Sequence, residues 1–301
     1  MNFPLTVVPT NEDSRLEIGQ APSTRRTIMT LGDKGGSSKS FLARKLAEIH
    51  LAASKPGLLL VDGDESVGSL AKFYAERTSD GSIALDQTER GVALFALHGK
   101  VDARDHLVND LLQRGRELVI VDMPATALTK LREISEDYNF GTAVATAGYR
   151  LTVLAPITPY DDTILDLQET IQLLDPEIFA EFTTQFDAVG PREGMKTQLM
   201  PRVDYVAVVN LGMAEDRQDF DLWDDPTSFT RALLAFIGGV ELEFPRMRPR
   251  IAAKLAKFRL SFSDGETAEQ LAITDRSRLT AWNLKAESVL RSAGGLLGFN
   301  G

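Results

Sequence analysis

Residues that could bind phosphate are concentrated in one short stretch, TLGDKGGSSKSF, at positions 30–41. Gly35 and Gly36 would allow the backbone to turn its N–H groups towards an anion. Lys39 could reach the β- and γ-phosphates of a nucleotide, and the Ser40 hydroxyl could bind Mg²⁺. The stretch follows an apolar run and opens a helical pattern, which is the context that a phosphate loop requires.

The same stretch departs from the usual phosphate-loop pattern, G-x-x-x-x-G-K-[ST]. Asp33 and Ser38 stand at the two positions where that pattern requires glycine. Lys34, a second lysine before the glycine pair, is also unusual. Considered alone, a glycine pair between a strand and a helix is often only a tight turn, so other residues must decide between the two interpretations.

Polar residues end three of the apolar runs of the chain. GLLLVD ends in Asp62, ELVIVD ends in Asp122, and DYVAVVN ends in Asn210. In parallel sheets, ligands bind at the carboxyl ends of the strands, so these residues are candidates for a ligand site. Each also has an ordinary structural interpretation. Asp62 or Asp64 could cap a helix, and Asp122 and Asn210 could be turn residues.

The order of apolar and amphipathic segments predicts an α/β fold. Short, almost continuously apolar runs are typical of strands that are covered on both faces, and helical patterns separate them. We therefore expect a doubly wound, mostly parallel sheet flanked by helices. The expected strands are 27–31, 57–62, 117–122, 150–156, 204–210 and 239–244; the expected helices are 39–53, 67–77, 103–114, 126–139, 160–174 and 228–237, with a mainly helical tail over 265–297.

The composition is ordinary for a globular protein, and the length of 301 residues permits one large α/β domain or two small ones. Residues 1–25 are polar and contain three prolines, which predicts a flexible N-terminal extension. The domain is expected over 26–297, with a helix and loop inserted near 175–202. No run approaches the roughly 18 apolar residues that a membrane span needs, and the first residues lack the pattern of a secretory signal. A cytoplasmic location is the simplest expectation.

The absence of cysteine excludes disulfides, Cys-metal sites and thiol catalysis. The three histidines, His50, His98 and His106, show no metal-binding spacing and are expected to be surface or packing residues. The formal net charge is −10, so binding to nucleic acid or an anionic membrane would require a local concentration of positive charge.

The arrangement K-G-G-x-x-K-[ST] over residues 34–40 resembles the deviant Walker A loop of the ParA/MinD family of P-loop ATPases, which have a SIMIBI-type fold. The resemblance implies that Lys34 is a signature lysine, which crosses a dimer interface to touch the ATP phosphates of the partner subunit. Asp33 is compatible with the family, whereas Ser38 replaces the usual glycine. Either the loop is reshaped, or a serine at positive φ costs about 1–2 kcal/mol. The nucleotide-binding residues that the resemblance implies here are Gly35, Gly36, Ser37, Ser38, Lys39, Ser40 and Phe41.

Two strand ends resemble the family's metal and water motifs. LLLVDGDES resembles the motif with D-x-D after a strand, and LVIVDMPA resembles the Walker B strand. The resemblance implies that Asp62 supports the Mg²⁺ shell together with Ser40, and that Asp64 orients the attacking water. Asp122 would hold Mg²⁺ through water, because magnesium keeps much of its hydration shell.

Two later segments resemble the family's base-binding motifs. VAVVN ends in Asn210, which would read the adenine edge. FPRMRPRIAAKLAKF resembles the loop after the final strand, where Pro245 and Arg246 would flank the base. The resemblance extends from about Arg26 to Leu290. Each motif is weak alone, but the ordered set of five is specific.

A basic cluster without any acidic residue lies within 14 residues near the end of the chain. It consists of Arg246, Arg248, Arg250, Lys254, Lys257 and Arg259. On a helix from about Pro249, Arg250, Lys254 and Lys257 share one face. Arg248 and these three residues form either a DNA- or partner-facing patch or a solvated face. The C-terminal helix carries several acids, which favours packing against the core over a membrane anchor.

The expected function is that of an ATPase that binds ATP and Mg²⁺, forms a homodimer on ATP and is released by slow hydrolysis, with Lys34, Lys39 and Asp64 as catalytic residues. The resemblance implies a stimulating partner protein, non-specific DNA binding at a nucleoid, and a role in intracellular positioning such as plasmid or chromosome partition or plasmid transfer.

Two alternatives stay open. One is a metabolic enzyme on the same fold, of the amidoligase type; an electron-donating reductase component would need cysteines for an iron–sulfur cluster. The other is a nucleotide-binding scaffold that has lost hydrolysis.

Overall fold

The structure, a computed structural model, describes residues 25–54, 57–63, 68–84, 87, 91–94, 115–137, 139–190 and 194–299. Several sequence predictions fall outside these ranges. They are the N-terminal extension before Arg25, the helix expected over 103–114, the catalytic role of Asp64, and the surface or packing roles of His98 and His106.

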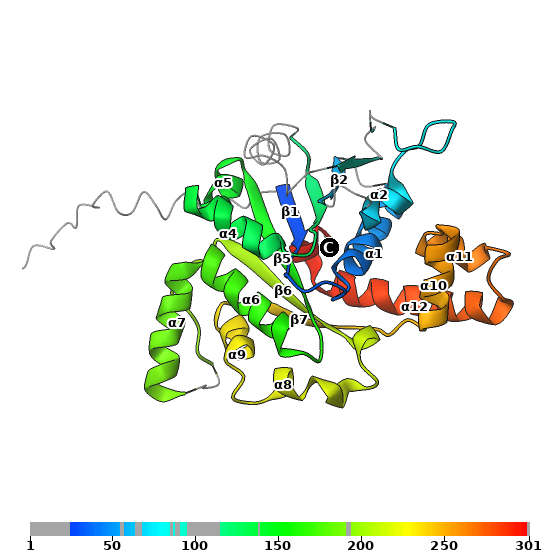
Figure 1. The fold of residues 1–301 in the computed structure, drawn as a ribbon. Coiled ribbons are helices and arrows are strands. Elements are labelled where there is room, and N and C mark those ends of the chain that lie inside the picture. Colours follow the sequence, from blue (N-terminus) through cyan, green and yellow to red (C-terminus); the bar gives the residue numbers. More distant parts are fainter. Residues whose placement is uncertain are drawn as a thin grey trace, which may run out of the picture.

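The described strands form one seven-stranded sheet at the centre of the molecule (Figure 1). Its order is β3-β2-β4-β1-β5-β6-β7, and all six strand pairs are parallel. The strands are β1 (Arg25–Thr30), β2 (Leu58–Asp62), β3 (Val92–Leu94), β4 (Leu118–Asp122), β5 (Tyr149–Ile157), β6 (Val203–Asn210) and β7 (Val240–Phe244). The predicted doubly wound α/β fold is therefore confirmed, and the sheet is parallel throughout.

Helices cover both faces of this sheet (Figure 1). The first face carries α4 (Ala127–Asp137), α5 (Phe140–Thr146), α6 (Asp161–Leu174), α7 (Pro176–Val189) and α9 (Phe229–Phe236); the second carries α1 (Lys39–Ala52), α2 (Ser69–Tyr74), α10 (Pro249–Phe258), α11 (Phe262–Thr267) and α12 (Ile273–Ser292). The short α8 (Asp221–Asp224) precedes α9. Successive strand residues point to opposite faces, so Ile28 and Met29 of β1 are both buried but belong to different core clusters.

Some elements differ from the sequence-based expectation. The helix expected over 67–77 is only α2, because the chain turns away and Arg77 forms an isolated antiparallel bridge with Ile83. The short strand β3 and the helix α5 were not predicted. The inserted segment near 175–202 contains α7, whose phenylalanines pack against Phe229 of α9.

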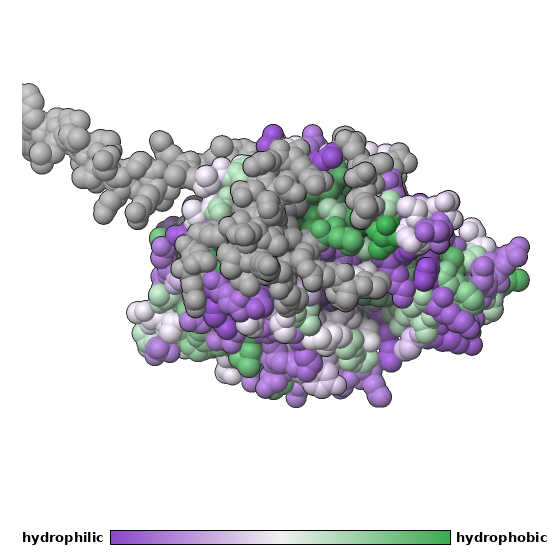
Figure 2. All heavy atoms as spheres, turned by 45° about the horizontal axis from the view of Figure 1, so that its top comes forward, coloured by the Kyte–Doolittle hydropathy of each residue, from purple (hydrophilic) through white to green (hydrophobic). Residues whose placement is uncertain are grey.

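The C-terminal helices pack against the core, as the sequence indicated. Leu279, Trp282, Ala286 and Leu290 of α12 are buried, whereas Leu284 is 67% exposed. Among the residues that the structure describes, no helix combines the length and apolar character that crossing a membrane requires. Figure 2 shows hydrophilic side chains over most of one described surface, with an apolar area near its centre.

A buried carboxylate joins α1 to α11. Glu48 accepts hydrogen bonds from the backbone N–H groups of Phe262 and Ser263, each at 2.8 Å, and from the Ser263 hydroxyl. These N–H groups lie at the start of α11, where a helix leaves its donors unpaired. Glu48 therefore fixes the C-terminal helices against the helix that follows the glycine-rich loop.

Candidate functional site

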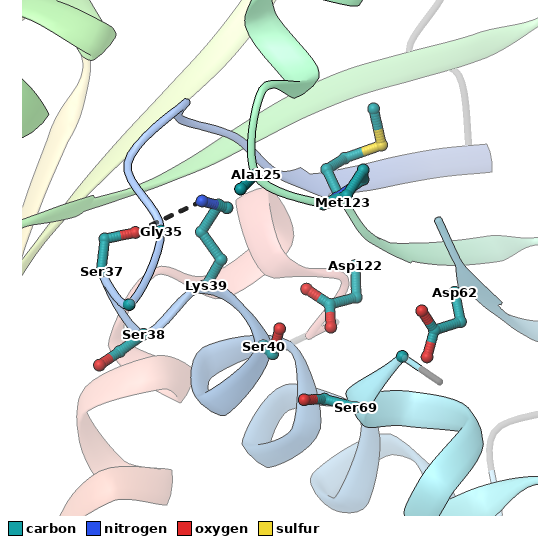
Figure 3. Close-up of a pocket in the computed structure, with 13 residues that line it drawn as sticks. Gly35, Ser37, Ser38, Lys39, Ser40, Asp62, Ser69, Asp122, Met123 and Ala125 are labelled. Carbon is teal, nitrogen blue, oxygen red and sulfur yellow. Dashed lines mark hydrogen bonds between the residues drawn. The ribbon is translucent and has the colours of Figure 1, made fainter. Parts of the chain in front are cut away.

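A cavity of about 260 Å³ lies at the carboxyl ends of β1, β2 and β4 (Figure 3). This is the edge of the sheet where ligands bind in doubly wound folds. The structure thus brings the glycine-rich loop together with Asp62 and Asp122, as the sequence predicted. The cavity is lined by Gly35, Gly36, Ser37, Ser38, Lys39, Ser40, Asp62, Gly68, Ser69, Asp122, Met123, Pro124 and Ala125.

Lys39 lies across the inside of the loop. Its ammonium group donates a hydrogen bond to the Lys34 carbonyl at 2.7 Å and lies 3.5 Å from the Ser37 hydroxyl (Figure 3). Lys39 is only 6% exposed, and this burial lowers its pKa despite the nearby charges of Asp166 and Asp122. A buried cation enclosed by a backbone loop favours an anionic ligand.

The loop reaches α1 through two residues whose backbone φ angles are positive, in the left-handed region. Gly36 has φ +77°, and Ser38 has φ 76°. Ser38 occupies the N-cap position of α1 but makes no side-chain cap, so the first N–H groups of this 14-residue helix are available to an anion. Ser38 thus adopts positive φ, which is one of the two alternatives that the sequence left open, at a cost of about 1–2 kcal/mol. Its hydroxyl lies 3.4 Å from the Met213 sulfur.

The carboxylate of Asp122 is buried at the end of β4 in the cavity. Burial raises its pKa to about 7; hydrogen bonds from Ser40 and Thr30 oppose the increase, and the charge of Asp62 adds to it. A divalent cation would relieve the repulsion between the two carboxylates, so the donor set fits Mg²⁺. No group of three His, Cys, Asp or Glu side chains in the described ranges could hold a metal. Mg²⁺ would therefore need Ser40, water and nucleotide phosphates to complete its shell.

Asp62 has a structural role in addition to its place beside Asp122. Its Oδ2 accepts a hydrogen bond from the Ala71 N–H group at 2.9 Å, in the first turn of α2. A Cβ atom at Gly68 would lie 1.5 Å from Asp62 Oδ1, so only glycine fits there. Asp62 thus binds a free N–H group of the first turn of α2, although the N-cap residue is Gly68, and its contribution to a Mg²⁺ shell remains a prediction.

Lys34 lies at the surface of the loop and is not among the residues that line the cavity. Its ammonium group pairs with the Asp162 carboxylate and lies 5.9 Å from the centre of the Tyr160 ring. The hydrogen bond and the charge of Asp162 raise the pKa of Lys34. The side chain is 47% exposed, so it could be reached by a second molecule.

A second, more open cavity of about 500 Å³ lies beyond β5 and β6 and adjoins the first one through Met213. Of the three residues predicted to contact a base, only Arg246 lines it. Asn210 is buried and accepts a hydrogen bond from the Gly212 N–H group at 3.0 Å. The buried Pro245 presents its carbonyl to the Trp282 indole at 2.9 Å. The lining residues are Pro159, Tyr160, Gly212, Met213, Ala214, Glu215, Asp219 and Arg246.

The side chain of Phe41 faces the protein interior. Its ring packs edge-on against Phe244, Phe262 and Trp282, with centroids 5.0–6.4 Å apart. A contact between Phe41 and a nucleotide could therefore come only from its backbone. The four rings connect the start of α1 with the C-terminal helices.

The basic cluster is less open than the sequence indicated. Arg250 and Lys254 lie on the predicted helix, but both bind Asp275 of α12, at 2.5 Å and 3.1 Å. The hydrogen bond from Arg250 is the main cause that lowers the pKa of Asp275. The cluster has no acidic residue within its own segment, but the fold brings Asp275 beside two of its members. Arg248 and Lys257 remain exposed.

Three aspartates that contact the loop were not recognised as site residues. Asp162 and Asp166 of α6 and Asp33 of the loop itself bind the loop or its neighbours. Acidic residues in the first turn of a helix are common, because they interact favourably with its N-terminus. Local sequence therefore indicates a helix start at Asp162 but not a contact with a loop more than 120 residues away.

No protein-family model matches the chain, and no curated protein matches it. Among solved structures, the chain is similar to a MinD cell division protein from Aquifex aeolicus, with 15% identity, a TM-score of 0.41, and coverage of 86% of this chain and 96% of that one. It is also similar to a ParA family ATPase from Chlorobium tepidum TLS, with 13% identity, a TM-score of 0.44, and coverage of 86% and 98%.

A third similar structure is the septum site-determining protein MinD from Pyrococcus horikoshii OT3, in complex with Mg-ADP. Its identity is 13%, its TM-score 0.43, and the coverage 90% of this chain and 98% of that one. These values are too low to support an inference about function. The function proposed below therefore rests on the residues of this chain.

Proposed function

We propose that the chain is a P-loop ATPase of the ParA/MinD type. The observation that carries the proposal is the buried ammonium group of Lys39, enclosed by the loop and facing the same cavity as Ser40 and Asp122. A buried lysine, a free helix N-terminus and a carboxylate at a strand end together fit a nucleotide polyphosphate with its metal. The triphosphate would lie in the first cavity.

Each component of the ligand has a group to bind it. Backbone N–H groups from Gly35 to Phe41 and the side chain of Lys39 would hold the phosphates. Ser40 and Asp122 would hold Mg²⁺, with support from Asp62; the metal supplies charge neutralisation when it is bound. The base would extend towards the second cavity, with Arg246 on its wall and Asn210 and Pro245 behind it.

Lys34 fits a role between subunits. Since Lys34 is exposed and lies outside the cavity, its ammonium group could leave Asp162 and reach the ATP phosphates of a second copy. The proposed ATP-bound state is thus a face-to-face homodimer, and hydrolysis with water oriented by Asp64 would release it. Loss of the γ-phosphate would remove the contacts that hold this state, so the protein would act as a switch.

The proposed biological role is intracellular positioning, in plasmid or chromosome partition or plasmid transfer. A partner protein would stimulate the slow hydrolysis in the cytoplasm. The exposed Arg248 and Lys257, together with the partly neutralised Arg250 and Lys254, are the candidate contacts for nucleoid DNA or for that partner.

Sizing of the protein with ATP and with ADP tests this proposal. The unaltered protein should dimerise with Mg-ATP and not with ADP, and Lys34→Ala should bind ATP but stay monomeric. Lys39→Ala should lose nucleotide binding. If ATP binds without producing a dimer, the proposed dimerisation switch is wrong. Hydrolysis that depends on a small-molecule substrate would then favour a metabolic enzyme of the amidoligase type. Dimerisation without measurable hydrolysis would favour the scaffold.

A further inference from the structure

Helix α4 begins without a cap from its own segment. Thr126 precedes the helix, but its hydroxyl donates to the Ala125 carbonyl and accepts nothing from the first turn. Thr126 also has φ 68°, which is rare for a β-branched residue. Two of the four non-glycine residues at positive φ in the described part of the chain, Ser38 and Thr126, thus flank the first cavity.

Asp33 provides the missing cap from a distance of 95 residues in sequence. Its Oδ1 accepts the Leu128 N–H group at 2.7 Å and the Thr129 N–H group at 3.4 Å, and its Oδ2 accepts the Thr129 hydroxyl at 2.7 Å. The Asp33 carbonyl also accepts from the Thr126 N–H group at 3.4 Å. A carboxylate at this end of an 11-residue helix binds its unpaired donors and is favoured by its dipole.

The backbone of Asp33 is held on its other side by α6. Asp166 Oδ2 accepts the N–H groups of Asp33 and Lys34, at 2.8 Å and 3.1 Å. Met123, Pro124 and Ala125, which connect β4 to the capped helix, line the cavity together with Lys39. One residue therefore links the phosphate loop to the opposite wall of the cavity.

We propose that Asp33 is a positioning residue that fixes residues 123–126 at the wall that faces the terminal phosphate. The N–H groups at the start of α1 are placed to bind the inner phosphates, so the segment after Asp122 faces the outer end of the ligand. Asp33 then sets how well the chain distinguishes ATP from ADP. This inference rests on the proposed nucleotide site, but its structural part can be tested without nucleotide.

The first measurement is amide hydrogen exchange in the nucleotide-free protein. Asp33→Ala should accelerate exchange at Leu128 and Thr129 about tenfold, because their acceptor is lost. Thr129→Val, which removes one of the three bonds, should have a smaller effect. Thr184→Val is the matched control, because its hydroxyl bonds only to a carbonyl of its own helix. Unchanged exchange in Asp33→Ala would overturn the proposal.

The second measurement compares the affinities for ADP and for a non-hydrolysable ATP analogue by calorimetry. Asp33→Ala should reduce the ratio of the two affinities about tenfold, with a smaller change for ADP. Thr129→Val should reduce it less, and not further in the Asp33→Ala background. An unchanged ratio, or additive effects, would overturn the positioning role. If the unaltered protein binds neither nucleotide, the proposed function fails, and hydrogen exchange alone decides the role of Asp33.

Should Asp33→Ala not fold, Asp33→Asn and Thr129→Val provide the same two readouts. The asparagine keeps an acceptor for the Leu128 N–H group but loses the charge. It should therefore accelerate Leu128 exchange more than Thr129→Val, which leaves the charged acceptor of the Leu128 N–H group in place. Slower exchange at Leu128 in Asp33→Asn than in Thr129→Val would contradict the proposal.

Discussion

The Lys34 ammonium group forms an ion pair with Asp162, which lies at the start of α6 in the same chain. In the proposed dimer, the same ammonium group binds the ATP of the partner subunit. One ammonium group cannot make both contacts at full strength, so the pair within the chain competes with dimerisation.

Asp162→Ala should therefore strengthen the ATP-dependent dimer. Both side chains are more than one-third exposed, and exposed pairs are weak, so the dissociation constant should fall by no more than about fivefold. Sedimentation velocity with Mg-ATP would measure it. Glu169→Ala is the matched control, since Glu169 also lies on α6 and forms a similarly exposed ion pair with Arg132 of α4. A weaker dimer in Asp162→Ala would show that Asp162 supports the interface.

Ser38→Gly should relieve the strain in the phosphate loop. Glycine adopts φ 76° without a steric cost, so the free energy of unfolding should rise by up to about 1 kcal/mol. Nucleotide affinity should also increase several-fold, because a relaxed loop can adjust to the phosphates. Ser54→Gly relieves similar strain at φ 49° beyond the end of α1 and should raise stability without affecting affinity. Equal affinity changes in both variants would argue against a local effect.

Nucleotide binding should change the fluorescence of Trp282. Its indole donates to the carbonyl of Pro245, and its ring lies 5.5 Å from that of Phe41, directly after the phosphate loop. Trp223, the other tryptophan, is buried in the cluster on the opposite face of the sheet. The change should therefore persist in Trp223→Phe and disappear in Trp282→Phe. Its loss in Trp223→Phe alone would contradict the proposed connection.

Asp204 should make stability depend on pH in acid. Burial alone would raise the pKa of Asp204, but its bonds with Arg150 and Arg26 outweigh burial and lower the pKa below 3.8. A lowered carboxyl pKa stabilises the fold above the unfolded value, and this contribution disappears as pH falls through the folded value. Asp204→Asn should lower the free energy of unfolding, measured with urea, by about 2 kcal/mol at pH 7. The decrease should be smaller below pH 3.8. A loss independent of pH would indicate a packing effect.

Binding to DNA, if the proposed role is right, should depend on Arg248 and Lys257 and fall steeply with salt. Fluorescence anisotropy with duplex DNA and Mg-ATP at two salt concentrations would measure it. Arg248→Ala with Lys257→Ala should reduce the slope of log affinity against log salt by about 2, one for each lost phosphate contact. Arg132→Ala, a surface change on α4, serves as the control. Absence of binding at low salt would leave the cluster as a structural or partner-facing feature.

Much of the candidate site could be predicted from sequence, because its parts are local. The loop joins β1 to α1 within a few residues, so its glycines and lysines are read together. Asp62 and Asp122 end apolar runs, and parallel strands place such ends at one edge of the sheet. The place of Ser38 in the loop pattern left two alternatives, positive φ or a reshaped loop, and the structure shows positive φ.

Elements with weak local signals were harder to predict. Strand β3 has only three residues, and its pairing with β2 depends on the assembled sheet. Helix α2 ends earlier than its pattern indicated, because tertiary pairing at Arg77 prevails over local helix preference.

The sequence by itself determined the glycine-rich loop, the α/β architecture and the chemical types of the cavity residues, because these follow from short-range order along the chain. Only the tertiary structure decided the partners of the charged residues. Asp33 caps α4, Asp162 holds Lys34, and Asp275 neutralises Arg250. These contacts join segments 25 to 128 residues apart, and whether such charges meet depends on how the helices pack against the sheet.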